Sequence, residues 1–382
     1  MTIQCPGCLS DINKEVIYSK KHCPVLNNVT YKTKEEALNC IVGNIELLLC
    51  HNCNIVFNGA FDGELMAYTQ DYNNERTFSH TYENYLNELV EVCSKGISAG
   101  TKILEIGCGK GNFLKRLCLA TGARGFGYDH TYEGDEQCGN NVKFFKKYFN
   151  PFNCEEVFDV IIMRHVLEHI QSPYHFLESI YRHGVLSPNA KLWIEVPGFE
   201  WIVKNGVFND ITYEHCNYFS KHALKNMVMS AGFNVVEVRN IFEDQYILLK
   251  AIYVSQNSVE LAKSNYDGSL FKFHSKFYKK KEEYNDIINS GDNICVWGVS
   301  GKGVIFLSEL AGNMLKRIKY AIDINPKKQG RFLPLSAKRV YPPEKLKEIE
   351  GAISVLIMNK MYEREICQNL DNMGVDAQTY VI

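Results

Sequence analysis

Four cysteines form two pairs whose spacing is typical of a metal site. Cys5 and Cys8 form one C-x2-C pair, and Cys50 and Cys53 form a second. Each such turn directs two thiolates toward one point, and two turns complete the tetrahedral sulfur shell that zinc favours. Four thiolates leave the metal no open position, so we expect a structural zinc ion rather than a catalytic one.

The connection between the two pairs is unusually long. Residues 9–49 form a longer connection than the loop of about 15 to 20 residues found in common zinc ribbons. We therefore expect an insertion with its own secondary structure, from Lys34 to Leu49. Cys23 and Cys40 lie in this connection and could compete as ligands. A redox dithiol in either pair is disfavoured, because neither pair lies in the βαβ pattern of dithiol oxidoreductases.

An aromatic and amide-rich segment follows the second cysteine pair. It runs from Phe57 to Asn74 and contains Tyr68 and Tyr72. Side chains of this kind often line a pocket for a small molecule, although a loop packed against a neighbouring domain would have the same composition. We take Tyr72 as a candidate catalytic residue.

A glycine-rich turn joins a predicted strand, Lys102–Ile106, to a predicted helix that begins at Asn112. Glycines at a strand-to-helix turn let the backbone approach a ligand closely, and the amides of the helix then point at that ligand. The glycines of this turn are Gly107, Gly109 and Gly111.

Two acidic residues accompany this turn. Glu105 lies near the end of the first strand, and Asp129 ends a second short strand that begins at Ala123. An acid in the position of Asp129 can bind ribose hydroxyls in both nicotinamide and S-adenosylmethionine enzymes. A dinucleotide fold needs G-x-G-x-x-G, but residue 112 is asparagine. The pattern E-x-G-x-G-x-G instead resembles the class I S-adenosylmethionine-dependent methyltransferases.

The resemblance continues along the chain. Residues 158–163 and 190–197 resemble the fourth and fifth strands of that fold, and Val166–His169 resembles the V-L-E-H segment after the fourth strand. The resemblance implies that the loops after the first four strands form the cofactor site, with Tyr148 and Phe149 covering the adenine. His169 is a candidate catalytic residue, with helix packing as its alternative role. The implied cofactor contacts are Glu105, Gly107, Gly109, Gly111, Asp129, Tyr148, Phe149 and Arg164.

The last part of the chain contains a second predicted α/β unit. A polar helical tract, residues 257–290, carries a basic run that we interpret as a solvated helix face. A strand from Asn293 then leads into a second glycine turn, Gly298–Gly303. Another strand, Ile318–Asp323, ends in an acid, and an apolar strand follows from Ala352 to Met358.

In this order the three parts resemble one family, the zinc-containing C-methyltransferases that use S-adenosylmethionine to modify nucleotide-linked keto-deoxy-sugars in bacterial antibiotic and surface-polysaccharide pathways. Gly298–Gly303 matches the family's G-x-x-x-K-G turn, and Asp323–Pro334 matches its D-x-N-P-x-K-Q-G-x-x-x-P segment. The resemblance covers the whole chain. It implies an α/β protein with a zinc-binding module at 1–80, a Rossmann-like class I methyltransferase domain at 81–254 and a C-terminal Rossmann-like domain at 255–382.

The segment Asp210–Ser220 is similar to the family's E-H-x-x-Y-F segment, which supplies polar groups facing the sugar. C-methylation must remove a proton from a carbon next to a ketone and stabilise the resulting enolate. We therefore assign His215 as the base and Glu214 as the group that orients it or contacts the sugar, with Tyr213 as a further candidate. A structural Glu–His pair that ties a loop to a strand is the alternative.

Two departures from the family concern the acceptor. Thr212 lies three positions before His215, where the family usually has an aromatic residue, and Phe242–Tyr246 replaces its usual glycine-serine turn. An O- or N-methyltransferase of a sugar or another small metabolite is therefore the nearest alternative. Lys302, in the second glycine turn, could pair with a substrate diphosphate or could be solvated.

Composition and charge exclude other classes. With 46% hydrophobic and 23% charged residues, this is an ordinary globular protein rather than a disordered, collagen-like or coiled-coil chain. The formal net charge of −2 disfavours a nucleic-acid partner, including the RNA of an RNA methyltransferase, because phosphate binding needs clustered cations. No segment approaches the ~18 apolar residues of a membrane span, so we expect a cytoplasmic enzyme with no membrane partner. A purely non-enzymatic role would predict loss of the cofactor contacts, which are all present.

Overall fold

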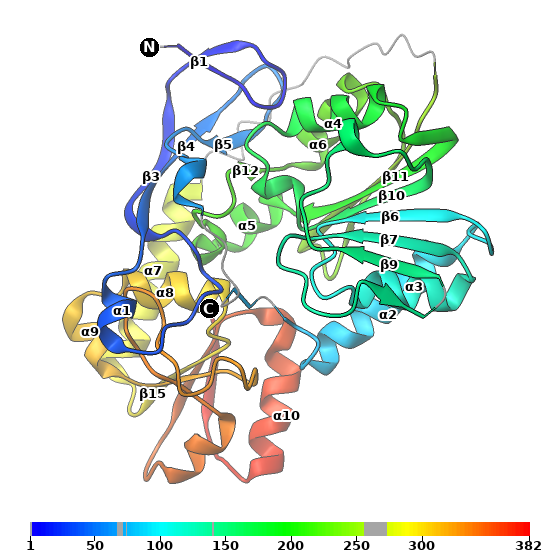
Figure 1. Cartoon of the computed structure of the whole chain (residues 1–382). Helices are drawn as coiled ribbons and strands as arrows, with labels where there is room; N and C mark the ends of the chain where they lie inside the picture. Colours follow the sequence, from blue (N-terminus) through cyan, green and yellow to red (C-terminus); the bar gives the residue numbers. More distant parts are fainter. Residues whose placement is uncertain (1, 67–71, 74, 140, 256–272) are drawn as a thin grey trace.

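Figure 1 shows the computed structural model of the chain, in which residues 2–66, 72–73, 75–139, 141–255 and 273–382 are described. The chain forms an N-terminal β-rich module, a central α/β domain and a C-terminal α/β domain. Residues 257–272 of the predicted helical tract 257–290, and the predicted pocket residue Tyr68, lie outside the described residues, whereas residues 273–290 of the tract form a helix. Within the described part, no helix is long and apolar enough to cross a membrane.

The N-terminal module is built from antiparallel strands. A hairpin of β1 and β2 carries the first cysteine pair, and the sheet β12-β5-β4-β3 contains the second pair between β4 and β5. The predicted structure within the long connection is confirmed, because α1 begins with a capping box between Thr33 and Glu36 and is followed by β4. The elements are β1 Thr2–Gln4, β2 Asp11–Asn13, β3 Val16–Pro24, α1 Lys34–Leu38, β4 Val42–Leu49, β5 Val56–Asn58 and the short 3-10 helix Gly63–Leu65.

The central domain is an eight-stranded sheet in the order β13-β14-β11-β10-β6-β7-β9-β8. Strands β11, β10, β6, β7 and β9 are parallel, and their central members are apolar runs because helices cover both faces. Helices α4 and α6 lie on one face and α2 and α3 on the other (Figure 1). The first strand, the glycine turn and the following helix are as predicted.

The bounds of the central domain's elements are α2 His80–Ser94, β6 Lys102–Ile106, α3 Asn112–Thr121, β7 Arg124–Tyr128, β8 Gln137–Cys138, β9 Val142–Phe145, β10 Phe158–Arg164, α4 Pro173–Arg182, β11 Leu186–Pro197, α5 Phe199–Asn205, β12 Asn217–Tyr218, α6 Lys221–Ser230, β13 Asn234–Ile241 and β14 Tyr246–Ile252, with short 3-10 helices at Pro151–Asn153, Leu167–His169 and Phe208–Asp210.

The C-terminal domain is a five-stranded parallel sheet in the order β17-β16-β15-β18-β19. The second predicted α/β unit is therefore present, with its glycine turn between β15 and α8. The elements are α7 Phe273–Ser290, β15 Ile294–Trp297, α8 Gly301–Glu309, α9 Gly312–Arg317, β16 Ile318–Ile322, β17 Val340–Tyr341, β18 Ser354–Ile357, α10 Glu363–Met373 and β19 Gln378–Val381, with 3-10 helices at Pro343–Glu348 and Lys360–Tyr362.

Contacts between the three parts enclose a common centre. Strand β12 lies within the predicted methyltransferase domain but pairs with β5 of the N-terminal module. The Arg331 guanidinium donates to the Thr30 carbonyl oxygen at 2.6 Å. The carboxylate of Glu365, on α10, accepts from the Ser79 hydroxyl at 2.6 Å and from the Thr81 amide at 3.0 Å, so the C-terminal domain caps the first turn of α2.

Candidate active site and metal centre

The four predicted cysteine ligands form one cluster. The Sγ atoms of Cys5 and Cys53 lie 3.6 Å apart, as do those of Cys8 and Cys50, and all four lie within 4.8 Å of one another. Tetrahedral zinc with Zn–S bonds of about 2.3 Å separates its sulfur ligands by about 3.8 Å. The cluster therefore fits a closed zinc site. Cys23 and Cys40, the two competing ligands, lie outside it.

A cleft of about 550 Å³ lies at the carboxyl ends of the central parallel strands. The turn after β6 lines it, with Gly107 and Gly109 in the left-handed region at φ 71° and 55°. Asp129 follows β7, and its Oδ2 atom accepts from the Gly109 amide at 2.8 Å while Oδ1 accepts from the Thr131 amide at 2.8 Å. The predicted second-strand acid thus connects the glycine turn to the next loop.

Glu105 is buried at the floor of this cleft, with 2% of its surface exposed. Burial raises the pKa of its carboxyl to about 8. Among the described residues, its Oε2 atom has no hydrogen-bond partner. A buried acid with one unpartnered oxygen in a cleft fits a ligand that brings positive charge, as S-adenosylmethionine does.

The remaining predicted cofactor residues have different surroundings. Tyr148 is 68% exposed and stacks on His130 at a centroid distance of 4.2 Å, whereas Phe149 is buried; both line the cleft. Arg164 also lines it, but its Nε atom is 2.9 Å from Glu195, so its charge is already paired. Gly111 does not line the cleft.

Gly111 caps α3 at φ 75°, and a Cβ atom there would lie 2.4 Å from the ring of Phe144. It therefore permits close packing of helix against strand rather than direct contact with a ligand in the cleft.

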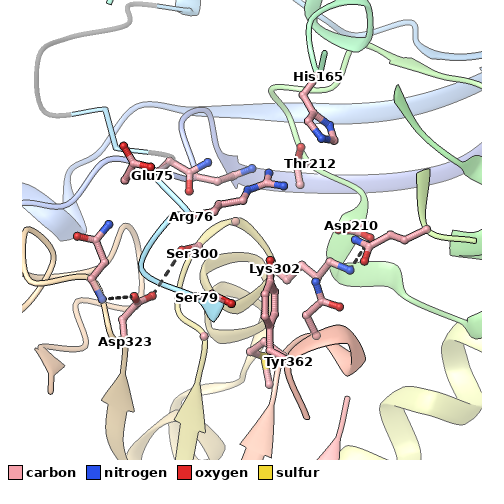
Figure 2. A pocket seen from close by; sticks show the side chains of 18 of the residues that line it. Glu75, Arg76, Ser79, His165, Asp210, Thr212, Ser300, Lys302, Asp323 and Tyr362 are labelled. Carbon is pink, nitrogen blue, oxygen red and sulfur yellow. Dashed lines mark hydrogen bonds and ion pairs between the residues drawn. The ribbon is translucent and has the colours of Figure 1, made fainter. Parts of the chain in front are cut away.

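A second cavity, of about 230 Å³, lies where the three parts of the chain meet. Its walls come from the loop before α2, the segments 165–169 and 210–215, the β13–β14 turn and the glycine turn of the C-terminal domain (Figure 2). Five residues line both this cavity and the cleft, so the two spaces adjoin there. These residues are Tyr72, Glu75, Arg76, His165 and His169.

The structure brings four of the predicted catalytic residues together in the second cavity. The Glu214 carboxylate accepts from the Asn27 amide and, at 2.7 Å, from the Tyr72 hydroxyl. The His169 Nδ1 atom donates to the Glu214 carbonyl oxygen at 2.8 Å, which leaves Nε2 without a proton in the neutral ring. The ring of His215 lies 4.9 Å from that of His169.

The protonation of this group follows from its burial. Burial, and then the neighbouring His169, lower the pKa of His215 to about 3, so its imidazole is neutral at pH 7. Burial raises the pKa of Glu214. A neutral imidazole beside a hydrogen-bonded carboxyl can accept a proton from a bound substrate.

A buried chain of charged groups behind His215 was not found from the sequence. Glu168 is 1% exposed, and its Oε1 atom lies 3.6 Å from His165 and 4.0 Å from His169. Burial alone would raise the pKa of Glu168, but His165 and His169 lower it, so it is ionised. His165 in turn lies 2.8 Å from Glu195 and has φ 53°, a conformation that holds its ring across the end of β10.

Tyr213 differs from its predicted role. Its side chain is fully buried, its ring packs on Phe61 at 5.4 Å, and its hydroxyl accepts from the Asp62 amide at 2.8 Å. It lines neither cavity. Tyr213 thus points into the N-terminal module, whereas its neighbour Glu214 faces the cavity.

Lys302 is not solvated. Its side chain is 12% exposed, and Nζ forms an ion pair with Asp210 at 2.8 Å. Beside it, Asp323 ends β16 and accepts from the Asn325 amide at 2.9 Å and the Ser300 hydroxyl at 3.4 Å. Figure 2 shows these groups around the amino-terminal end of α8.

Both departures from the family pattern lie in the second cavity. The hydroxyl of Thr212 is buried with no hydrogen-bond partner among the described residues. Phe242, Glu243 and Asp244 form the β13–β14 turn with φ values of 51°, 48° and 67°. This strained turn places the next two residues, Gln245 and Tyr246, in the cavity wall.

Comparisons with known proteins agree with this architecture. The profile of a family described as "Methyltransferase domain" matches residues 78–238. A second profile, described as "C-methyltransferase C-terminal domain", matches residues 262–382. The C-methyltransferase NovU of Streptomyces niveus is 22% identical over 286 residues, which cover 68% of this chain and 67% of that relative.

Two solved structures each resemble less than half of the chain. A SAM-dependent methyltransferase of Aquifex aeolicus is 18% identical, covers 47% of this chain and 95% of its own, and has a TM-score of 0.36. The cyclopropane synthase MmaA2 of Mycobacterium tuberculosis is 13% identical, covers 48% of this chain and 72% of its own, and has a TM-score of 0.36.

Proposed function

We propose that this chain, which belongs to the S-adenosylmethionine-dependent C-methyltransferase family, methylates a carbon atom next to the ketone of a nucleotide-linked keto-deoxy-sugar. The observation that carries the proposal is the meeting of the two cavities. The cleft at the glycine turn and the second cavity share His165 and His169 in their walls, beside Glu214 and His215 of the second cavity. Bound cofactor and acceptor would therefore meet next to groups that can move a proton.

The cleft is the proposed site of S-adenosylmethionine. When bound, the cofactor supplies an electrophilic methyl group on its sulfonium. Asp129 would bind the ribose hydroxyls, Glu105 would face the positive charge, and Tyr148 and Phe149 would flank the adenine. The charge of Arg164 is already paired with Glu195. Arg164 would therefore act on the cofactor site indirectly, by holding Glu195, rather than by contacting the cofactor.

Replacing Asp129 with alanine is expected to raise the Kd for S-adenosylmethionine about 10- to 100-fold. A hydrogen bond to a charged group contributes about 1.5 to 3 kcal/mol, and Asp129 also holds the Gly109 amide in place. Isothermal titration calorimetry measures the change. Asp135→Ala is the matched control, because Asp135 is exposed and lies outside the cleft. Unchanged affinity in Asp129→Ala would remove the ribose role.

The second cavity is the proposed acceptor site. His215 would accept the proton from the carbon next to the ketone, and Glu168 behind it would stabilise the imidazolium that forms. Tyr72 and Glu214 are hydrogen-bonded to each other and would contact the sugar hydroxyls. His169 would hold the 210–215 segment through the Glu214 carbonyl.

The C-terminal glycine turn is the proposed site for the nucleotide half of the substrate. The amides at the start of α8 favour a phosphate, and Asp323 ends its strand as Asp129 does in the central domain. Lys302, which now pairs with Asp210, would turn partly toward the diphosphate and form an ion pair with it. The four-cysteine cluster is the proposed structural zinc site, held by Cys5, Cys8, Cys50 and Cys53.

Methyl transfer to oxygen or nitrogen is the second candidate. The unpartnered Thr212 hydroxyl and Gln245 Oε1 favour it, because they give the acceptor cavity two polar atoms that could orient a hydroxyl or amino group. No base acting on carbon is needed in that case.

Product analysis separates the two. The enzyme is incubated in deuterium oxide with labelled S-adenosylmethionine and a panel of nucleotide-linked 4-keto and non-keto sugars, and the products are identified by mass spectrometry and NMR. The proposal expects methylation of keto sugars alone, with solvent deuterium incorporated next to the ketone when the cofactor is omitted. Methylation of non-keto sugars at oxygen or nitrogen would refute the carbon route.

A further inference from the structure

Arg76 stands where the two cavities meet, and no carboxylate pairs with it among the described residues. Its Nη1 atom donates to the Tyr246 hydroxyl at 3.0 Å, and its guanidinium lies 5.7 Å from the centroid of the Tyr82 ring. The neighbouring cations Lys302 and Arg164 are both paired with carboxylates. Arg76 is an exposed residue and has no carboxylate partner within the described residues, so its positive charge can contact solvent or an anion in the shared space.

The acids in the cavity wall are engaged elsewhere. Glu75, its neighbour in the chain, accepts from the Thr77 hydroxyl at 2.5 Å and from Asn112 at 3.4 Å. Glu168 faces the histidines, and Glu365 caps α2. The remaining wall carboxylates, Asp210, Glu214 and Asp323, have the partners given above. An arginine without a carboxylate partner, among acids that have partners of their own, can bind an anion that enters with the ligand.

Arg76 also lies close to the reacting groups. Its positive charge contributes, after burial, His169 and His165, to the lowered pKa of His215. Figure 2 shows its guanidinium between Thr212 on one side and Ser300 and Lys302 on the other.

We propose that the Arg76 guanidinium stabilises the enolate oxygen of the acceptor during methyl transfer. This inference rests on the proposed carbon methylation. The C–H bond next to the ketone breaks, its proton goes to His215, and its electron pair forms the C=C bond while the carbonyl π electrons move to oxygen. That oxygen, now negative, is held by Arg76. The C=C electrons then form the bond to the methyl carbon, the carbonyl re-forms, and the S–CH3 electrons remain on sulfur as a neutral thioether.

The tethers of Arg76 suit this role. The Tyr246 hydroxyl and the Tyr82 ring hold the guanidinium before any charge develops, so little reorganisation is needed when the enolate forms. The strained β13–β14 turn fixes Tyr246, whose ring stacks on Phe242 at 5.2 Å and meets His165 edge-on at 4.6 Å. The turn that differs from the family pattern is therefore the one that holds Tyr246, and Tyr246 in turn holds Arg76.

The test compares Arg76→Gln and Arg76→Lys with the intact enzyme in deuterium exchange next to the ketone, with the demethylated cofactor present and no methyl donor. Removal of one oxyanion donor typically costs a factor of about 10² to 10³. We expect Arg76→Gln to lose about that factor in exchange rate and in kcat, with less than about threefold change in the Kd of cofactor or keto sugar. Arg76→Lys should recover part of the rate. Arg116→Gln is the matched control, because Arg116 pairs with Glu83 outside both cavities.

Each other outcome overturns the inference in a distinguishable way. Weaker cofactor binding with normal exchange at saturation would assign Arg76 to the cofactor carboxylate. Weaker sugar binding with normal exchange at saturation would assign it to the diphosphate. Methyl transfer by the intact enzyme without any exchange would refute the enolate, and with it both the carbon route and the role of Arg76. Thermal unfolding of each variant identifies any loss that comes from misfolding.

Discussion

Replacing His215 with asparagine is expected to lower kcat for methyl transfer about 10³-fold while leaving S-adenosylmethionine binding within about threefold of the intact enzyme. A positioned general base contributes typically about 10² to 10⁴ in rate. His215 lines the second cavity but not the cleft at the glycine turn, so the loss should fall on the proton-transfer step. The measurements are kcat by product formation, deuterium exchange into the keto sugar, and cofactor titration.

Asparagine keeps the approximate size of the ring and a hydrogen-bonding group, so that packing against His169 and Tyr218 is disturbed little. His175→Asn is the matched control, because His175 lies on α4 with 55% of its side chain exposed and lines neither cavity. If His215→Asn retained more than a tenth of the exchange rate, the base would have to be another group, and Glu214 would be the next to replace.

The pH dependence of kcat/KM gives an independent check on His215. An unshifted histidine loses half of its basic form near pH 6.5 as the pH falls. Because the pKa of His215 is lowered to about 3, its basic form persists in the free enzyme well below that pH. We expect no fall in kcat/KM from its protonation between about pH 8 and pH 5.5. A loss of activity centred near pH 6.5, present in the intact enzyme and absent in a His215 variant, would contradict the buried environment.

Residues in strong local patterns were predicted well from the sequence. The two cysteine pairs, the β6 strand with its glycine turn, and the acid after β7 each depend on spacing within a few residues, and the structure brings them together as expected. The Glu214–His215 segment was proposed for the acceptor site because its neighbours matched a known pattern, and the structure places both residues in the wall of the second cavity. Patterns of this kind reflect local backbone geometry, which does not depend on how the domains pack against one another.

Residues whose role depends on the packing of distant segments were not predictable. Arg76 lies in an irregular loop with no motif. It lacks a carboxylate partner among the described residues only because β14 brings Tyr246 to it and its neighbouring acids find other partners. The role of Glu168 was not predicted, because the V-L-E-H sequence does not indicate whether its acid faces solvent or the neighbouring histidines. Tyr213 was placed in the site by its neighbours in sequence, although its side chain points the opposite way.

Replacing both Cys50 and Cys53 with serine is expected to remove the bound zinc and to lower the apparent Tm by about 10 °C or more. Loss of a structural metal costs more than about 4 kcal/mol in many domains, and 1 kcal/mol corresponds to about 2 to 4 °C in a domain of 150 to 250 residues. Metal analysis should give one zinc per intact chain and much less than one per variant chain. Cys138→Ser/Cys367→Ser is the matched control, because both thiols lie outside the cluster.

The loss should reach the acceptor cavity as well as the N-terminal module. Cys53 lies just before β5, whose Val56 and Phe57 pair with β12, and the Asn58 amide donates to the Cys216 carbonyl oxygen at 2.9 Å. Release of the metal would therefore loosen the strand that holds the residue next to His215. We expect methyl transfer to fall at temperatures below the Tm of the variant, while cofactor binding, which depends on the central sheet, is retained. Full zinc occupancy in the double variant would refute the metal site, and full activity without zinc would show that β12 keeps His215 in place unaided.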